Sequence, residues 1–217
     1  MHSKKIGIDE CEIVTIRKNI TTVRITDSEI AEIKQNFDEN FGIRLIHDKK
    51  IASIQTTNEE NISDVITKGV RTIKTLKPRD FWNGLPEKNE FSQLDGTFDK
   101  KIKHISGAEA ADIAQNMINN SENKKIDTIT GSLNLVYENF ELNNSNGLNF
   151  NNEATYISGI INAVQPISTI SVHNSFLYGR KLLSLSSLIK ESGDFKFKNS
   201  FAESLSIFCS PLIIKAI

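Results

Sequence analysis

The fold is decided by the stretch Gly42-Ile-Arg-Leu-Ile-His47, Asp48-Lys49, Lys50-Ile-Ala-Ser-Ile-Gln55. Two isoleucine-containing segments flank a polar junction, and polar residues at such a junction favour a reversal of the chain. The stretch therefore predicts a β-hairpin with strands over 42–47 and 50–55.

Upstream of this hairpin the chain predicts a β-meander. Alternating, β-branched segments are typical of half-buried strands, and the short polar clusters between them predict turns. The predicted strands are 12–17, 21–25 and 30–34, and the predicted turns are Lys18-Asn19, Asp27-Ser28 and Asp38-Glu39-Asn40.

Two helices are predicted downstream. Apolar residues recur at i, i+3, i+4 and i+7 over 62–76 and again over 110–118, which indicates one apolar stripe on each helix. The pairs with capping-box spacing are Thr57 with Glu60 and Ser106 with Glu109. Pro78 is expected to end the first helix.

Residues 78–105 predict a loop, because prolines and glycines punctuate them. Their aromatic residues are expected to pin this loop to the domain; they are Phe81, Trp82, Phe91 and Phe98. Stacking on nucleic-acid bases is the alternative, but no basic surface accompanies them.

A second β-rich block follows, and its predicted strands are 126–138, 140–142, 148–150 and 153–165. Asn146-Gly147 is a strong hairpin signal within it. The order strands, helix, loop, helix, strands predicts an α+β fold of antiparallel β-meanders with two main helices. From Pro166 the pattern degrades, and residues 176–188 fit either a helix or an irregular linker.

The composition favours a folded domain without a broad electrostatic field. Of the 217 residues, 38% are hydrophobic and 24% charged, and the formal net charge is −1. No nucleic acid and no membrane is therefore expected as a partner. Cys11 and Cys209 suggest no disulfide framework and fit a reducing, cytoplasmic setting. Neither a signal peptide nor a membrane-spanning run is expected.

Five segments in order resemble the amino-terminal domain of the TldD/PmbA family. Residues 7–13 are similar to the family's Gly-Ala-Asp-x-x-Glu-Val, and residues 41–53 to its Gly-x-Arg-Val-x-x-Asp-Gly-x-x-Gly-x-Ala. The helix after Thr57 stands where the family has one. Residues 141–147 resemble its Asn-Ser-x-Gly turn, and residues 207–212 resemble a strand near the opening of its second domain.

The resemblance implies a peptide-processing protein of a metallopeptidase-related family that is also called modulator of DNA gyrase. It implies a TldD/PmbA-like N-terminal α+β domain over 1–165, then a linker and the start of a truncated carboxy-terminal domain over 166–217. The implied partners are a second copy or a TldD-type protein, as a homo- or heterodimer, and unfolded or modified peptides.

Departures from the family pattern bear on catalysis. Only six residues precede Gly7, so we expect the family's first helix to be absent, and Lys50 and Ile51 replace glycines. Active TldD-type members resemble zinc enzymes with a His-Glu-x-x-x-His helix and a distant Cys in the second domain, whereas PmbA/TldE-type members lack that motif. The four histidines here are not paired at helical spacing; they are His2, His47, His104 and His173. We therefore expect no cofactor, no metal-binding residue and no catalytic residue in this chain, which resembles the front of either type.

Two histidine pairs favour structural interpretations. His47 beside Asp48 suggests a base with an orienting acid, but a surface residue of the hairpin is the simpler interpretation. His173 near Ser175 suggests a nucleophile pair, yet a triad also needs an orienting acid and an oxyanion site, so we favour a linker residue.

Other chemistry-bearing residues are interpreted in the same way. Cys11 and Cys209 are expected to be buried structural thiols. Asp38-Glu39 is expected to be a solvated turn. Gly107 and Gly131 form no phosphate-cradling motif, so nucleotide binding is not indicated.

The sheet itself is the remaining candidate. A curved antiparallel sheet with open edges can receive an extended peptide by β-augmentation, in which backbone hydrogen bonds supply the affinity. A scaffold that serves only dimerisation is the alternative. The sequence thus indicates a peptide-capture or dimerisation part, or else a non-catalytic module that pairs with a full-length family partner, and it leaves open which edge binds peptide.

Overall fold

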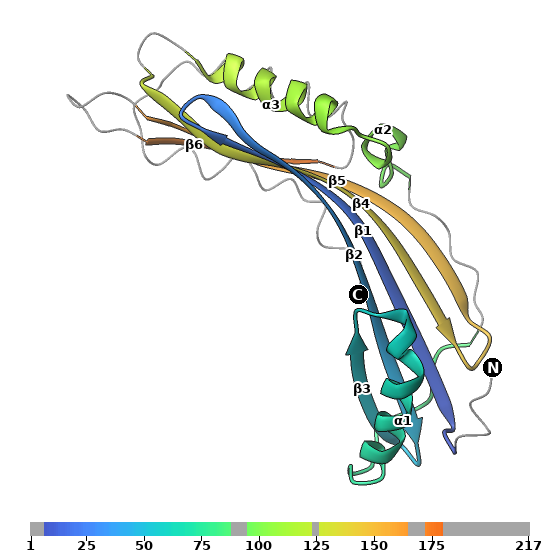
Figure 1. Cartoon of the computed structure of the whole chain (residues 1–217). Helices are drawn as coiled ribbons and strands as arrows, with labels where there is room; N and C mark the ends of the chain where they lie inside the picture. Colours follow the sequence, from blue (N-terminus) through green and yellow to red (C-terminus); the bar gives the residue numbers. More distant parts are fainter. Residues whose placement is uncertain (1–6, 88–94, 123–125, 165–171, 180–217) are drawn as a thin grey trace.

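One antiparallel sheet organises the computed structural model, which describes residues 7–87, 95–122, 126–164 and 172–179 (Figure 1). Its six strands lie in the order β3-β2-β1-β4-β5-β6. The strands are β1 Glu10–Thr26, β2 Glu29–His47, β3 Lys50–Thr56, β4 Thr128–Asn144, β5 Asn149–Val164 and β6 Val172–Gly179. The helices are α1 Ile62–Ile73, α2 Lys100–Lys103 and α3 Gly107–Ser121, and η2 Glu59–Asn61 is a 3₁₀ turn. The predicted α+β class is confirmed.

Two tight turns fix the first three strands. Asp27 and Ser28 join β1 to β2, and Asp48 and Lys49 join β2 to β3; all four have positive φ, between 48° and 63°. Positive φ at both central residues defines the type I′ turn, whose twist matches that of the flanking strands. The predicted hairpin at 42–55 is confirmed, with His47 paired to Lys50.

The strands are longer than the sequence predicted. The turns expected at Lys18-Asn19 and at 38–40 are wrong, because β1 and β2 continue through both places. Cross-strand partners hold these polar residues extended: Lys18 Nζ lies 2.8 Å from Glu138 Oε2. In the same way, the segments predicted separately in the second β block merge into β4 and β5.

The helices follow their apolar stripes, with changes at the ends. Ser106 and Glu109 form the predicted capping box at the start of α3. The box predicted for Thr57 and Glu60 is wrong: Asn58 Oδ1 accepts the Glu60 N–H at 2.9 Å, and α1 begins only after this 3₁₀ turn. The short helix α2 arises inside the predicted loop.

Residues 172–179 form a strand, so the helix or linker expected from 176 onward is wrong up to Gly179. The outer edge of β5 offers them backbone partners, from Ile157 to Val164, and this pairing overrides the weak local pattern. Residues 180–188 lie outside the described part of the chain.

Both main helices cover the same face of the sheet. Cys11 and Ile13 of β1 pack with α1, and Val23 and Ile25 of β1 pack with α3. These four residues are all odd-numbered in one strand, and alternate residues of a strand share a face. We call this the helix face. Its middle, between α1 and the α2–α3 segment, is not covered by a described helix (Figure 1). Within the described residues, no helix combines the length and apolarity needed to cross a membrane.

The loop after α1 is tied to the sheet by Glu10. Its carboxylate accepts hydrogen bonds from Trp82 Nε1 at 2.9 Å and from the Leu85 N–H at 2.9 Å. Burial raises the pKa of Glu10, but these bonds and one from Asn146 outweigh it, and the net pKa lies below the ordinary value. The predicted pinning by aromatic residues is therefore confirmed for Trp82, whereas it is wrong for Phe81, which is 73% exposed. Phe98 packs edge-to-face on Tyr137 as predicted, and Phe91 lies outside the described residues.

Candidate functional site

The most exposed regular feature is one edge of the sheet. β3 pairs with β2 only over residues 41–47. On that side of β2, residues 29–40 have no strand partner in the described part of the chain, although β1 pairs with them on the other side. This segment is called the open edge below. It carries two exposed apolar side chains, Ile33 at 42% and Phe37 at 62%.

The turn geometry shows which backbone groups of the open edge point outward. In a two-residue hairpin the flanking residues bond to each other, so the backbone of His47 faces β3. Successive residues alternate in direction, so odd-numbered residues of β2 point away from β1. Along the open edge, the outward N–H and C=O groups therefore belong to Ile33, Gln35, Phe37 and Glu39.

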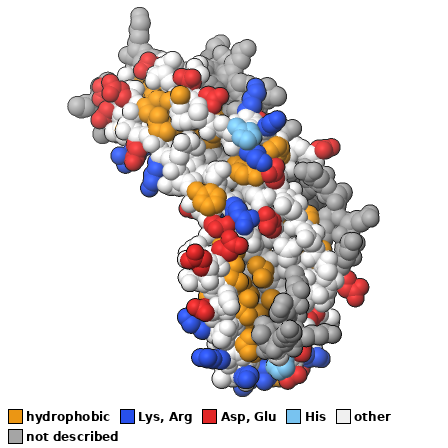
Figure 2. Space-filling view, turned by 45° about the vertical axis from the view of Figure 1, so that its right-hand side comes forward, with side chains coloured by type: hydrophobic (Ala, Val, Ile, Leu, Met, Phe, Trp, Pro, Cys, Tyr) orange, Lys and Arg blue, Asp and Glu red, His pale blue; other side chains and the backbone are white. Residues whose placement is uncertain are grey.

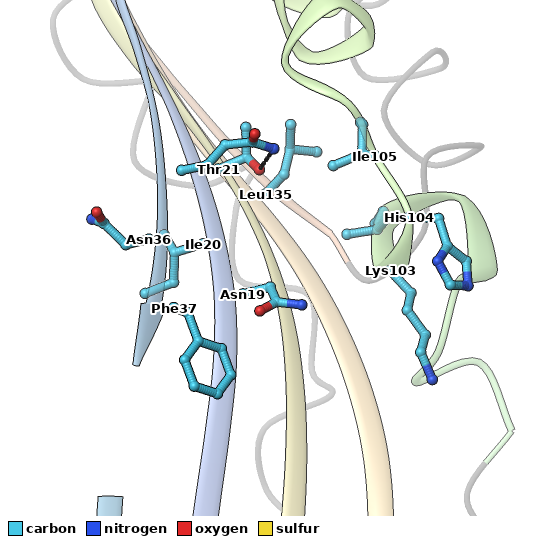
Figure 3. Close-up of a pocket in the computed structure, with 11 residues that line it drawn as sticks. Asn19, Ile20, Thr21, Asn36, Phe37, Lys103, His104, Ile105 and Leu135 are labelled. Carbon is cyan, nitrogen blue, oxygen red and sulfur yellow. Dashed lines mark hydrogen bonds between the residues drawn. The ribbon is translucent and has the colours of Figure 1, made fainter. Parts of the chain in front are cut away.

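A groove lies beside the open edge on the helix face (Figure 3). Its volume is about 370 Å³. Gln35, Asn36 and Phe37 of β2 form one rim, and Lys103 and His104 at the end of α2 form the other. The side chain of Gln35 donates to Thr21 Oγ1 at 3.2 Å on the floor. The groove thus opens next to the backbone groups that have no partner strand.

A polar cluster fixes the far rim of the groove. Lys103 Nζ lies 2.5 Å from Glu153 Oε1, and Tyr137 Oη donates to the same oxygen at 2.6 Å. Lys103 also lies 4.7 Å from the centre of the Tyr137 ring, within cation–π range. The hydrogen bond from Lys103 holds the pKa of Glu153 below its ordinary value, and the same contact raises the pKa of Lys103. The cluster therefore anchors α2 to β4 and β5 through a charge-assisted contact.

This cluster gives a first prediction. Lys103→Met should lower the free energy of unfolding by up to about 1 kcal/mol, because the ion pair is only partly shielded from water. Amide exchange in α2 should accelerate, since one of its ties to the sheet is lost. Lys101→Met, which changes an exposed lysine of the same helix, is the matched control and should leave both readouts unchanged. Equal exchange in the two variants would show that Lys103 does not anchor α2.

Charged residues separate the groove from the α1 end of the helix face. Arg17 lies between two carboxylates, with Nε 2.5 Å from Glu39 Oε1 and Nη1 2.9 Å from Glu141 Oε1. Figure 2 shows acidic and basic side chains gathered at the middle of the molecule, with apolar patches on either side. The open edge is acidic, because it carries four carboxylates and one lysine: Glu29, Glu32, Lys34, Asp38 and Glu39.

The opposite edge of the sheet is partly covered. β6 pairs with β5 from Ile157 to Val164. Just below, the Thr155 N–H donates to the Thr97 carbonyl at 2.9 Å, and Thr155 Oγ1 accepts from the Asp99 N–H at 2.8 Å. The segment leading into α2 thus occupies the backbone of β5 beside the groove. Beside the groove, the backbone of β5 at Thr155 is therefore occupied, whereas the outer backbone groups of β2 have no strand partner among the described residues.

The sequence-derived candidates lie away from the groove. His47 and Asp48 are brought together at the β2–β3 turn, with Asp9 as a third member that the sequence did not single out; Nδ1 and Nε2 of His47 each lie 3.5 Å from a carboxylate oxygen. His173 and Ser175 lie two residues apart on β6.

Cys11 is half-buried, and burial raises the pKa of its thiol, as for an unreactive thiol. Cys209 lies outside the described residues. Asp38 and Glu39 belong to the open edge and not to a turn.

The Asp9, His47 and Asp48 grouping does not fit the zinc centre of the family. Among the described residues it is the grouping whose ligand atoms lie within 4.8 Å of one another. It offers one imidazole and two carboxylates that are 56% and 73% exposed, and Asp9 Oδ2 already accepts the Asp48 N–H at 2.8 Å. A zinc peptidase helix offers two imidazoles on one face and a glutamate to activate water. No catalytic step is derived from this grouping.

The open edge was missed by sequence reasoning because the predicted turn at 38–40 cut β2 in two. The signal was present in the spacing of Ile33, Gln35 and Phe37, which places two apolar side chains on one face of a strand. Nothing local in the sequence showed that β3 would stop opposite Phe41.

The architecture defines a class of protein: an α+β domain on one long antiparallel sheet, with both main helices on one face and a groove beside an open strand edge. Residues 11–73 match the family model described as PmbA/TldA metallopeptidase domain 1. Over these residues the chain is similar to the first domain of the family that the sequence resembles, so the match supports that resemblance. No curated protein matches the chain.

Solved structures share the fold. TldE from Thermococcus kodakarensis superposes with a TM-score of 0.73 at 18% identity, covering 88% of this chain and 44% of that one. A putative modulator of a DNA gyrase from Thermotoga maritima superposes with a TM-score of 0.71 at 15% sequence identity, covering 88% of this chain and 44% of that one. A putative modulator of DNA gyrase from Bacteroides thetaiotaomicron superposes with a TM-score of 0.67 at 14% sequence identity, covering 82% of this chain and 42% of that one. The chain thus spans less than half the length of these structures.

Proposed function

We propose that this chain is the peptide-capturing part of a TldD/PmbA-type peptide-processing protein, and that the open edge of β2 holds an unfolded or modified peptide as an added strand. The observation that carries the proposal is the row of outward backbone groups at 33, 35, 37 and 39, which lack a strand partner among the described residues. Strand addition satisfies these groups and requires no particular peptide sequence.

The groove supplies a place for one side chain of such a peptide. A residue opposite Gln35 or Phe37 would point to the helix face, because paired residues in an antiparallel ladder share a face. The exposed ring of Phe37 and the apolar groove residues Ile105 and Leu135 favour an apolar side chain there. The peptide backbone would thus provide the affinity, and the groove would add a mild preference for an apolar side chain.

Cleavage belongs to another part of the assembly in this proposal. The Asp9, His47 and Asp48 grouping does not match a zinc-peptidase centre, so in this proposal zinc, as in active full-length members, would be held by a carboxy-terminal domain or by a TldD-type partner. Because β6 belongs to the sheet, the linker and the start of such a domain are placed after Gly179 in this proposal, in a cytoplasmic protein. Under the alternative proposal, a non-catalytic module that pairs with a full-length family partner, the same edge would bind that partner.

The test uses the fluorescence polarisation of a short labelled peptide of alternating valine and threonine. Gln35→Pro removes one outward N–H and should weaken binding at least about tenfold, because an edge proline blocks strand addition while leaving the β1 ladder intact. Gln35→Ala keeps the N–H and should bind within about twofold of the wild type.

Each result separates the two proposals. Wild-type binding that Gln35→Pro abolishes supports peptide capture on this edge. Equal binding by the proline and alanine variants would place the peptide elsewhere. Absence of binding by the wild type, at concentrations where it is monomeric, would leave only the partner-docking alternative.

A further inference from the structure

Side chains of the open edge that point away from the helix face carry charges in a fixed order. These are the even-numbered residues of β2, among which Lys34 and Asp38 are exposed. Lys34 stands opposite Thr22 of β1, and Asp38 stands opposite Lys18, whose ammonium already contacts Glu138 at 2.8 Å. Within the described part of the chain, neither Lys34 nor Asp38 forms an ion pair of its own. Both charges are therefore available to an added strand.

An added strand would bring its side chains closest to β2 at these two positions. The outward backbone groups belong to odd-numbered residues, so Lys34 and Asp38 occupy non-hydrogen-bonded positions of an antiparallel ladder. Cα atoms at such positions lie about 4.5 Å apart, against about 5.5 Å at hydrogen-bonded positions. Opposite charges that face each other there stabilise the ladder, and like charges destabilise it. The open edge can therefore distinguish strands by the charges that they carry at two places four residues apart.

The direction of an added strand is indicated by β3. This strand pairs antiparallel with the same side of β2 and ends with Thr56 opposite Phe41. A peptide that begins beyond Thr56 and runs in the same direction continues the line of β3 along β2. Such a peptide meets Asp38 first and Lys34 four residues later. Antiparallel pairing is also slightly more stable per residue than parallel pairing.

We infer that the open edge selects peptides in which a basic residue is followed, four residues later, by an acidic residue, and binds them antiparallel to β2. The basic side chain lies opposite Asp38 and the acidic side chain opposite Lys34. The two intervening residues that face Phe37 and Gln35 lie at the groove, where apolar side chains fit. The inference rests on the proposed peptide capture, to which it adds a sequence preference and a direction.

Protection of the edge is the simpler explanation of its charges, because charged side chains commonly guard edge strands against pairing. Protection would disfavour every added strand to a similar extent, whatever the order of its charges. It also leaves the exposed Ile33 and Phe37 unexplained, since exposed apolar side chains promote association. A dependence of binding on the order of charges therefore separates selection from protection.

Glu32 limits the size of the preference. A peptide with the reversed order, acidic residue first, can shift by two residues and place its basic residue opposite Glu32. That register gains one favourable pair, and Arg24 already lies 3.8 Å from the Glu32 carboxylate. The forward order gains two favourable pairs, opposite Asp38 and Lys34. The difference is one cross-strand charge pair, which corresponds to about threefold in affinity.

Two labelled peptides of identical composition test the order of charges. One contains Lys-Val-Thr-Val-Asp and the other Asp-Val-Thr-Val-Lys, each flanked on both sides by alternating valine and threonine. Fluorescence polarisation with the full chain should show about threefold tighter binding of the first peptide. In about 1 M salt the difference should disappear, because the Debye length falls to about 3 Å and screens exposed charge pairs.

Lys34→Asp should abolish the preference. Either peptide then forms one favourable and one unfavourable pair opposite residues 34 and 38, so the two affinities become equal. The substitution changes an exposed side chain without an ion pair in the described part of the chain, so the sheet should be retained. Lys68→Asp makes the same change of charge at an exposed position of α1 and is the matched control, which should keep the preference of about threefold.

The outcomes separate this inference from the function on which it rests. Equal binding of the two peptides by the wild type, lost for both in Gln35→Pro, would retain capture at the edge and overturn the selection by charge. Tighter binding of the acidic-first peptide would contradict antiparallel addition. A preference that survives Lys34→Asp would assign it to other residues and would also overturn the inference. Absence of binding by either peptide would remove peptide capture itself, and the selection with it.

Discussion

Gly131→Ala is expected to lower the free energy of unfolding by about 3 kcal/mol, at the upper end of the cost of overpacking. A Cβ at this position of β4 would lie 2.3 Å from the carbonyl oxygen of Ile160 and 3.2 Å from Cγ1 of Ile161. Ile161 is the direct partner of Gly131 in β5. The nearest obstacle is backbone, so relief requires a shift of the β4–β5 ladder, and the core below α3 would be disturbed with it. Denaturation by urea measures the change.

Gly42→Ala is the matched control for this prediction. Gly42 is also a strand glycine in the same sheet, but a Cβ there meets Val14 at 3.9 Å, an ordinary contact. We expect a change within about 0.5 kcal/mol, since alanine has no strained contact to relieve and reduces the freedom of the unfolded chain. Equal destabilisation by the two substitutions would mean that the close approach at Gly131 does not limit the packing of β4 on β5.

Asn144→Ala is expected to destabilise the domain by a similar amount, about 3 kcal/mol. The side chain is 1% exposed and makes three hydrogen bonds. Its Nδ2 donates to the Pro86 carbonyl at 2.8 Å, and its Oδ1 accepts the N–H groups of Asn146 and Leu148 at 2.9 and 3.0 Å. Truncation leaves the buried N–H of Leu148 without an acceptor, removes the bonds to Pro86 and Asn146, and frees the loop that Glu10 and Trp82 hold.

Asn139→Ala tests whether burial decides the size of this effect. Asn139 is a β4 asparagine whose side chain donates to Asn151 Oδ1 at 2.9 Å in a solvent-exposed pair. Water replaces such a partner, so a loss of no more than about 0.5 kcal/mol is expected. Thermal unfolding of both variants, with Trp82 fluorescence as a probe of the loop, makes the comparison. A loss at Asn139 as large as that at Asn144 would contradict the role given to the buried network.

The sequence was sufficient to predict those helices and turns that depend on local patterns. The I′ turn at Asp48-Lys49, the apolar stripe of α1 and the capping box of Ser106 and Glu109 each arise from residues within a few positions of one another. The resemblance to the family was also accessible, because segments such as 41–53 keep their order and spacing. Turn preference failed at Lys18-Asn19 and at 38–40, where partners twenty or more residues away in the sequence hold the chain extended.

Local patterns in the sequence therefore encode the α+β class and the helices, and they carry the resemblance to the TldD/PmbA family. The tertiary structure decided where the open edge lies. That edge exists because β3 stops opposite Phe41 while β2 continues, and because residues 97–99 occupy the other side of the sheet at Thr155. Both facts depend on which strands lie side by side and where each strand ends. Strand pairing joins segments that are distant in the sequence, so the spacing of neighbouring residues does not predict it. The outward direction of Gln35 and Phe37, on which both proposals depend, follows only from that pairing.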